Sequence, residues 1–280
     1  MVGQQPQINY TIFSSDRREL TDRFTREESS IAAGNANTWV LQPKPHSHLR
    51  VCAYNVHGFI EARDQPLFTQ VIRALQADFL AILEFSVFGE LSWFTSLYPY
   101  RYIPPDTSNF AFFSNYPITN CQIVNLSSQR KMGDVTILTD SGYLNLLVPH
   151  LHYQDQASRV QETQQLLRHY RAKPYQPTVV MGDLNQVNAA ELAPKQLKIM
   201  KQQYKERNNE DYNNQVFELL SQEFTDSFAR LGWRAPPSTH WTTTRVDYVL
   251  VNKAVEVKSS YVFHGAFSDH LPIMADLSLG

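Results

Sequence analysis

Several features that would place this chain in a particular class of protein are missing from it. Its 280 residues hold two cysteines and no CxxC pair. This excludes a disulfide framework and argues against a structural zinc site. The first residues, MVGQQPQINY, lack the basic and apolar regions of a signal peptide, and the longest apolar runs, such as LAIL and LNLLV, are too short to cross a bilayer. We therefore expect a soluble cytoplasmic protein without a transmembrane segment.

An excess of charge of either sign is also absent. The chain has 25 basic and 27 acidic residues, for a net charge of −2. A global positive field is excluded, so a nucleic-acid partner would have to be held by local patches. What the chain does have is length and apolar content: 42% of its residues are hydrophobic. That is enough to bury a sizeable core in one large domain or two small ones.

The chain divides into a polar N-terminal part and a regularly patterned remainder. Residues 1–48 contain the charged stretch DRRELTDRFTREESS, which favours a helix, and the proline-containing linker QPKPHSH. We interpret this part as an N-terminal arm or a cover packed on the domain. Residues 49–280 form the main predicted domain, in which a polar stretch at about 188–224 is an insertion of two helices and a loop.

Strand and helix patterns alternate through residues 49–280. PLFTQVIRALQA, FGELSWFTSLYP and DQASRVQETQQLLRHYRA have helical character, and DVTILTDSGYLNLLVPHLHY predicts a hairpin that turns at DSG. The predicted strands are HLRVCAYNV, DFLAILEF, NFAFFSN, ITNCQIVNL, TVVMGD, TRVDYVLVN, VEVKSSYVF and LPIMADLSL. This mixture is an α/β pattern, and it favours sheets packed face to face with helices outside over a purely parallel doubly wound sheet.

Polar side chains recur where these apolar strands end. The clearest case is VVMGDLNQV, in which a buried strand gives way to Asp183 and Asn185. Each such residue alone has an ordinary explanation as a turn cap, a solvated group or a core histidine. Together they form a coherent set, because rigid strands position catalytic groups well. Carboxylates and amides without thiolates suit Mg²⁺ or Mn²⁺ better than zinc. The set comprises Asn55, Glu84, His150, Asp183, Asn185, Asp247, Asp269 and His270.

The ordered motifs AYNVHG, AILEF, PHLHY, GDLNQV, RVDYVLV and SDHLPI resemble the signature of the endonuclease/exonuclease/phosphatase superfamily, the deoxyribonuclease I-like group of metal-dependent phosphodiesterases. The resemblance covers about residues 49–279. A single GDLN would be weak evidence, whereas the ordered set is specific. The family implies a four-layer αββα sandwich, with two mixed sheets face to face, helices outside and the active site at one edge.

The resemblance also implies roles for individual residues. Glu84 would bind Mg²⁺ (or Mn²⁺), with Asn55 steadying the ion or the attacking water and Asp269 reaching the metal. Asp183 would orient and deprotonate the water, and Asn185 would hold a phosphate oxygen. The reaction is in-line attack of water on phosphorus, with the metal neutralising charge.

Two histidines complete the implied set. His150 and His270 would contact the scissile phosphate from opposite sides, with Asp247 fixing the tautomer of His270. Two departures from the family pattern weaken parts of this assignment. Leu83 stands where a glutamine is common, and His57 stands where some members have an aspartate. His152 shares a strand face with His150 and is an alternative phosphate contact.

The substrate is a separate question, because a fold does not fix it. The residues around Gln186 and Asp247 count against inositol-polyphosphate phosphatases and tyrosyl-DNA phosphodiesterases. Nucleases and sphingomyelinase-like or phosphoinositide phosphoesterases stay open, as does a catalytically inactive binding protein. Lys198, Lys201 and Lys205 fall on one face of a predicted helix and would suit a nucleic-acid backbone. We therefore favour a nuclease, and the alternative is that this row is an ordinary solvated face. The sequence does not indicate an oligomeric state.

Overall fold

A computed structural model describes residues 44–45, 47–60, 65–87, 96–105, 109–173, 176–208, 210–240, 244–264 and 268–280. The chain divides into two compact units, residues 1–38 and 39–280, and every described residue belongs to the second. The predicted helices in the N-terminal arm and at FGELSWF lie outside the described residues. The extent of that arm therefore stays a prediction. Among the described helices, none is long and apolar enough to cross a membrane.

Two six-stranded mixed sheets form the centre of this unit. The first has the order β11-β12-β1-β2-β4-β3, and only β1 and β2 pair in parallel. Its strands are β1 (Leu49–Ile60), β2 (Phe79–Val87), β3 (Tyr100–Tyr102), β4 (Phe110–Ser114), β11 (Val255–Val262) and β12 (Ile273–Leu279). Long-range pairing of β1 with β12 joins the start of the unit to its end.

The second sheet has the order β5-β6-β7-β8-β10-β9, and only β7 and β8 pair in parallel. Its strands are β5 (Ile118–Asn125), β6 (Lys131–Thr139), β7 (Gly142–Pro149), β8 (Thr178–Asp183), β9 (Thr225–Asp226) and β10 (Asp247–Val251). The predicted hairpin is confirmed, because β6 pairs with β7 and the chain turns at residues 140–141. The short strands β3 and β9 were not predicted.

The main core lies between the two sheets. Alternate residues of each strand point inward, as Val51 and Ala53 do in β1 and Val179 and Met181 do in β8, and all four are buried in one cluster. Phe112 of β4 fills the middle of this cluster. It lies so close to Gly133 that a Cβ atom there would fall 2.2 Å from the ring.

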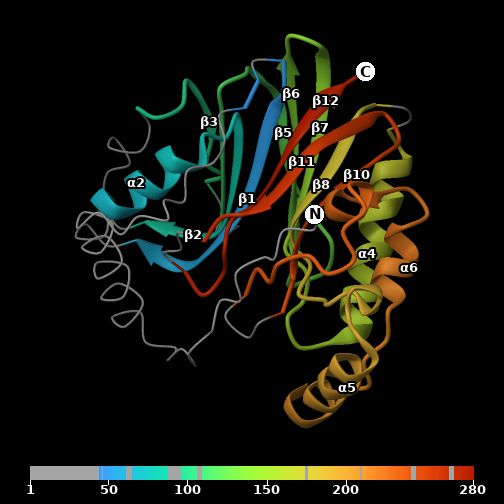
Figure 1. Cartoon of the computed structure of the whole chain (residues 1–280). Helices are drawn as coiled ribbons and strands as arrows, with labels where there is room; N and C mark the ends of the chain where they lie inside the picture. The colour runs from blue at the N-terminus through green and yellow to red at the C-terminus, as the bar shows by residue number, and fades with distance from the viewer. Residues whose placement is uncertain are drawn as a thin grey trace, which may run out of the picture. The chain divides into compact units, whose positions relative to one another are not determined.

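Helices cover the outer faces of both sheets (Figure 1). Over the first sheet, α2 (Gln65–Leu75) buries Val71, Ile72 and Leu75, and its Phe68 ring stacks with Tyr54 of β1. Over the second sheet, α4 (Gln156–Arg171) and α6 (Gln215–Leu220) share a cluster with the outward residues of β8 and β10. The predicted four-layer fold with two face-to-face sheets is confirmed.

The polar insertion contains η2 (Ala189–Glu191), α5 (Pro194–Asn208) and α6, and the unpredicted short helix α7 (Ser227–Arg230) follows it. Helix α5 turns its Leu197, Met200 and Tyr204 toward a small cluster with Val187 and Tyr212. These positions recur at helical spacing, so one side of α5 is apolar and packed although the helix as a whole is polar. This packing attaches the insertion to the end of β8, where the GDLN segment lies.

Candidate active site

Four of the eight predicted catalytic or metal residues continue the inward faces of core strands. After Val51 and Ala53, the next inward position of β1 is Asn55, and after Val179 and Met181 the next inward position of β8 is Asp183. Because side chains alternate along a strand, these polar groups must emerge between the two sheets rather than on an outer face.

The same argument places two further groups. On β10, Asp247 precedes the inward residues Val249 and Val251 and pairs directly with Asp183. His150 follows the inward residues of β7 and forms an isolated bridge with Asp183. The site is therefore built where the core ends, at one edge of the two sheets.

Glu84 reaches the site by breaking this alternation. In a regular strand its side chain would follow Leu80 and Ile82 to the helix-covered face, but its φ angle is +54°. A left-handed conformation is uncommon for a residue other than glycine, and such strain is typical of functional positions. The carboxylate of Glu84 instead meets Asn55 of β1 and His150 of the opposite sheet.

Asn55 links the carboxylates at the centre of the site. Its Nδ2 donates to Oε1 of Glu84 (3.0 Å) and to Oδ2 of Asp183 (3.1 Å). Its Oδ1 accepts a hydrogen bond from the backbone N–H of His57 (3.0 Å). Asn55 is fully buried, so these bonds fix the two acidic groups relative to each other across the two sheets.

The GDLN segment holds Asp183 in place with its own backbone. The N–H of Asn185 donates to Oδ1 of Asp183 (2.8 Å), and Nδ2 of Asn185 donates to the carbonyl of Leu151 (3.0 Å). Asn185 has a φ of +47°, which brings the segment round sharply. Gly182 is required because a Cβ atom there would lie 2.3 Å from the carbonyl oxygen of Pro149. Burial, with the nearby Asp247, raises the pKa of Asp183 to about 7.

His270 and Asp247 form a buried pair. Nδ1 of His270 lies 2.9 Å from Oδ2 of Asp247, and Nε2 of His270 lies 3.9 Å from Oδ2 of Asp183. Burial opposes the charged imidazolium, but the carboxylates of Asp247 and Asp183 outweigh it and raise the pKa of His270 to about 10. His270 thus carries a positive charge at neutral pH, with Nε2 aimed at the centre of the site.

His150 has the opposite electrostatic character. Burial, together with the charges of Arg130 and His270, lowers the pKa of His150 to about 3. Its Nε2 lies 3.4 Å from Nη1 of Arg130 and 3.5 Å from Oε1 of Glu84. His150 is therefore neutral, and the cation on this side of the site is Arg130. Arg130 was not predicted, because it lies in the turn between β5 and β6, where an arginine has no distinguishing pattern.

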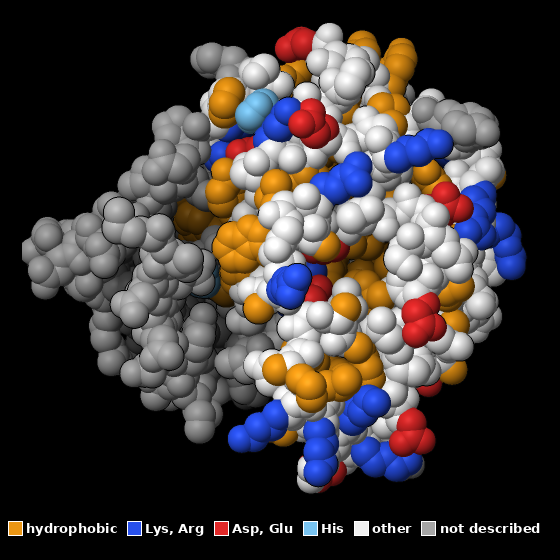
Figure 2. Space-filling view, turned by 45° about the vertical axis from the view of Figure 1, so that its right-hand side comes forward, with side chains coloured by type: hydrophobic (Ala, Val, Ile, Leu, Met, Phe, Trp, Pro, Cys, Tyr) orange, Lys and Arg blue, Asp and Glu red, His pale blue; other side chains and the backbone are white. Residues whose placement is uncertain are grey.

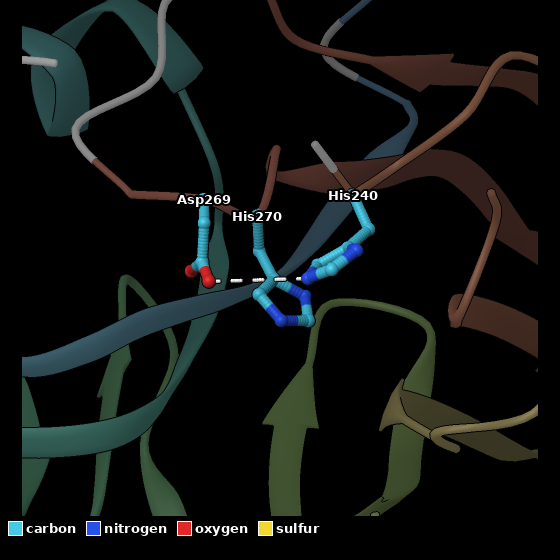
Figure 3. Close-up of side chains that lie close together, drawn as sticks. All are labelled: His240, Asp269 and His270. Atoms are coloured by element: carbon cyan, nitrogen blue, oxygen red, sulfur yellow. Dashed lines mark ion pairs between the residues drawn. The ribbon is translucent and has the colours of Figure 1, made fainter. Parts of the chain in front are cut away.

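His240 is a second group that the sequence analysis missed. It lies outside every predicted strand, yet it forms an isolated bridge with His270, and the two rings meet edge to face at 4.6 Å. Figure 3 shows His240 on one side of His270 and Asp269 on the other, with Nε2 of His240 3.8 Å from Oδ2 of Asp269. Burial and the adjacent His270 lower the pKa of His240 to about 4. His240 thus packs against His270 as a neutral ring.

Two of the predicted metal residues, Glu84 and Asp269, line the site, and the third, Asn55, is buried behind Glu84. Ligand atoms of Glu84, His150 and Asp183 lie within 4.8 Å of one another, as do those of Asp269, His240 and His270. Nδ1 of His57 lies 3.7 Å from Oε2 of Glu84 and 3.8 Å from Oδ1 of Asp269. Carboxylate oxygens with a neighbouring imidazole fit a divalent cation. Asn55 turns its amide nitrogen toward Glu84, so in this arrangement it orients a carboxylate.

These groups open into a cavity of about 670 Å³. Its walls include every predicted catalytic or metal residue except the buried Asn55 and Asp247, and they add His57, Arg130, Lys131, Tyr153 and His240. His152 is not among the lining residues. Its Nδ1 accepts hydrogen bonds from the N–H groups of Gln154 and Asp155 (3.2 and 3.0 Å), so it shapes the turn before α4.

The predicted lysine row lies outside this cavity. Lys198, Lys201 and Lys205 are exposed on α5, on a different side of the helix from the packed Met200. Lys205 lies 3.4 Å from the exposed Asp211. Figure 2 shows Lys and Arg side chains gathered at the lower edge of the view, where α5 lies in Figure 1.

Comparison with known proteins agrees with the fold described above. The model of a family described as the Endonuclease/Exonuclease/phosphatase family matches residues 52–270. No curated protein matches the chain significantly. Among solved structures, the human Nocturnin catalytic domain with bound sulfate anion is 20% identical, with a TM-score of 0.61 over 84% of this chain and 94% of that one.

Two bacterial structures are similar to the same extent. An endonuclease/exonuclease/phosphatase from Beutenbergia cavernae is 19% identical, with a TM-score of 0.60 over 84% of this chain and 72% of that one. The mannosyl-6-phosphatase Bt3783 of Bacteroides thetaiotaomicron is 14% identical, with a TM-score of 0.60 over 82% of this chain and all of that one. At these identities the likeness shows the fold.

Proposed function

The chain belongs to the endonuclease/exonuclease/phosphatase family, and we propose that it is a metal-dependent hydrolase of phosphodiester bonds in nucleic acid. One observation carries the proposal: Asp183 lies beside the Asp247–His270 pair, within a cavity that Glu84 and Asp269 also line. A general base and a fixed cation that face the same cavity are what water attack on a phosphate needs.

The chain's own groups provide a binding site for a phosphate. The imidazolium of His270 and the guanidinium of Arg130 supply positive charge, while the neutral His150 and Asn185 supply hydrogen bonds. Donors of this kind are most effective when they are already in place before the charge develops. Asp247 holds His270 in place, and the carbonyl of Leu151 holds Asn185.

Asp183 is the proposed base. Its carboxylate accepts a proton from the attacking water as the water oxygen bonds to phosphorus and the bond to the leaving alcohol oxygen breaks. Its environment suits this role, because a base titrating near 7 is available and still accepts a proton readily. The charge that builds on the phosphate oxygens is met by Nε2 of His270.

Glu84 and Asp269 are the proposed holders of Mg²⁺ or Mn²⁺, with His57 between them. When bound, such an ion would neutralise charge on the phosphate oxygens or the leaving group. The role of Asn55 is to orient Glu84 and Asp183 through its amide nitrogen.

The choice of nucleic acid rests on α5. Lys198, Lys201 and Lys205 form an exposed basic row on the helix that follows the GDLN segment. A polyanion held at the site can extend along such a row, whereas a small phosphate ester has no use for it. The similar structures do not decide this point, since their printed names include a phosphatase and Nocturnin.

A screen of purified protein tests the proposal. Plasmid DNA, single-stranded RNA, sphingomyelin and phosphoinositides would be incubated with Mg²⁺, with Mn²⁺ or with a chelator, in parallel with Asp183→Asn. We expect metal-dependent cleavage of nucleic acid by the wild type and a loss of about 100-fold or more in the variant. Cleavage of a lipid alone would overturn the choice of substrate, and no cleavage of any ester would overturn the proposed enzyme.

A further inference from the structure

A second cavity of about 180 Å³ adjoins the catalytic one. Asn185 and His270, which the proposed function assigns to the phosphate, line both cavities, as do Tyr153 and His240. The remaining walls of the second cavity come from Val187, Met200, Gln203, Tyr204, Thr244 and Val246. A group joined to a phosphate at His270 can therefore point into this cavity.

Helix α5 forms one wall of this cavity and is held firmly against the domain. Met200 is buried, and the ring of Tyr204 meets that of Tyr212 edge to face at 5.2 Å. The fully buried Arg159 lies 5.7 Å from the centre of the Tyr204 ring, and its Nη2 donates to Glu210 (2.7 Å). The wall is thus fixed by apolar packing, by the aromatic contact and by the nearby Arg159 before any ligand arrives.

The lining favours a flat ring with polar edges. Val187, Met200 and Val246 are apolar, and Tyr153 and Tyr204 present aromatic rings. Gln203, Thr244 and Asn185 add a few side chains that can donate or accept hydrogen bonds. At about 180 Å³ the cavity is smaller than the roughly 300–1,000 Å³ of sites for drug-sized ligands. It therefore has room for one ring system.

Tyr153 stands at the junction of the two cavities. Its side chain is 56% exposed, and Cζ of Arg130 lies 5.4 Å from its ring centre. An exposed tyrosine beside a phosphate-binding arginine resembles the stacking platforms on which proteins hold single-stranded nucleic acid. A base held there must leave its neighbours in the strand, which an unpaired strand permits at low cost.

We propose that the second cavity is a subsite for one unpaired base of the substrate, the base next to the scissile phosphate. This inference rests on the proposed function and deepens it, because it makes single-stranded nucleic acid the substrate class. The base stacks on Tyr153 and lies against α5, while its phosphate remains at His270 and Asn185.

The test compares kcat/KM for a dinucleotide and for the same molecule lacking the base on one side. Stacking energies predict a preference for the complete dinucleotide of about 5- to 150-fold in the wild type. Gln203→Trp, which fills the cavity from an exposed position, and Tyr153→Ala should each bring the ratio close to one. Ile199→Trp and Tyr143→Ala are matched controls at exposed positions that do not line the cavity, and the ratio should not change in them.

A wild-type ratio near one, or a ratio unchanged in both cavity variants although their melting curves show them to be folded, would overturn the subsite. Calorimetry would compare the affinity of the protein for a nucleoside 5′-monophosphate with its affinity for ribose 5-phosphate. This comparison distinguishes a missing base subsite from a failure of the proposed function. Tighter binding of the nucleotide, lost in Gln203→Trp, supports the subsite even if no ester is hydrolysed. Equal binding of the two compounds, or displacement only by a short-chain phospholipid, counts against it.

Discussion

Oδ2 of Asp247, at the start of β10 in the second sheet, lies 2.9 Å from Nδ1 of His270, which leads into β12 of the first. Both residues are buried. The carboxylate fixes the ring orientation, places a proton on Nδ1 and leaves Nε2 directed toward the site. The positive charge of His270 therefore depends on a residue that does not line the catalytic cavity.

This dependence predicts how the two residues respond to substitution. Asp247→Asn should lower kcat/KM by about 100- to 10,000-fold, because the imidazole loses the charge that keeps it protonated. Adding Asp247→Asn to His270→Ala should cost little more than His270→Ala alone, since groups that act as a unit are non-additive. Steady-state kinetics of both single variants and the double variant measure this. Losses that multiply would show that the two residues act independently.

A second prediction concerns the metal. Glu84→Gln should reduce activity by roughly 100-fold or more, because a charged ligand is lost while the side-chain shape is kept. Calorimetry should also show weaker Mn²⁺ binding, and circular dichroism should be unchanged. Glu256→Gln, at an exposed position of β11, is the matched control. Near wild-type turnover at low Mg²⁺ in the Glu84 variant would remove this residue from the site.

A third prediction concerns the lysine row on α5. Changing Lys198, Lys201 and Lys205 together to alanine should weaken nucleic-acid binding and flatten its salt dependence. The log–log slope should fall by up to about one unit for each phosphate contact that is lost. Lys253→Ala with Lys258→Ala, at exposed positions beside and within β11, is the control. A slope equal to that of the wild type would identify the row as an ordinary solvated face.

A fourth prediction concerns stability and pH. The buried Arg50 donates to Asp276 through Nε (2.6 Å) and Nη2 (3.0 Å), and Ser259 also donates to this carboxylate (2.9 Å). Burial opposes ionisation, but these bonds outweigh it and lower the pKa of Asp276. Asp276→Asn should reduce the free energy of unfolding at pH 7 by about 3–5 kcal/mol, because it removes the carboxylate charge to which the buried Arg50 guanidinium is bonded.

The pH dependence of this effect follows from the sign of the shift. A carboxyl with a depressed folded-state pKa stabilises the protein above its unfolded pKa of about 3.9 and loses that contribution as pH falls further. The difference between wild type and variant should therefore shrink below about pH 4. Urea unfolding between pH 7 and pH 3 measures it, with Asp140→Asn in the exposed β6–β7 turn as the control. Equal midpoints at pH 7 would contradict the argument.

The sequence predicted the parts of the site that follow from regular strands. Side chains alternate between the two faces of β1 and β8, and this alternation places Asn55 and Asp183 on the core side. The ordered motifs indicate the four-layer fold. The two helices of the insertion follow from their spacing in the same way. The strands β3 and β9 were missed because three and two residues are too few to show any period.

The remaining site features depend on tertiary structure. Glu84 reaches its partners through a left-handed backbone angle, which no alternation pattern reveals. His240 and Arg130 come from a loop and a turn, where position along the chain says little about position in space. The cavity beside α5 exists because Met200 and Tyr204 pack toward Val187, and helical spacing alone cannot name the surface that they meet.

Three pairs of site residues connect the two sheets. They are Asn55–Asp183, Glu84–His150 and Asp247–His270, in which His150 follows β7 and His270 precedes β12. The geometry of the site therefore depends on how the two sheets are aligned with each other. Sliding one layer by a single residue step, about 3.3 Å, would separate all three pairs while every ladder within each sheet stayed whole. Catalysis should fail on such a slip before any spectroscopic signal of secondary structure changes, so the packing of the core between the sheets holds the site in register.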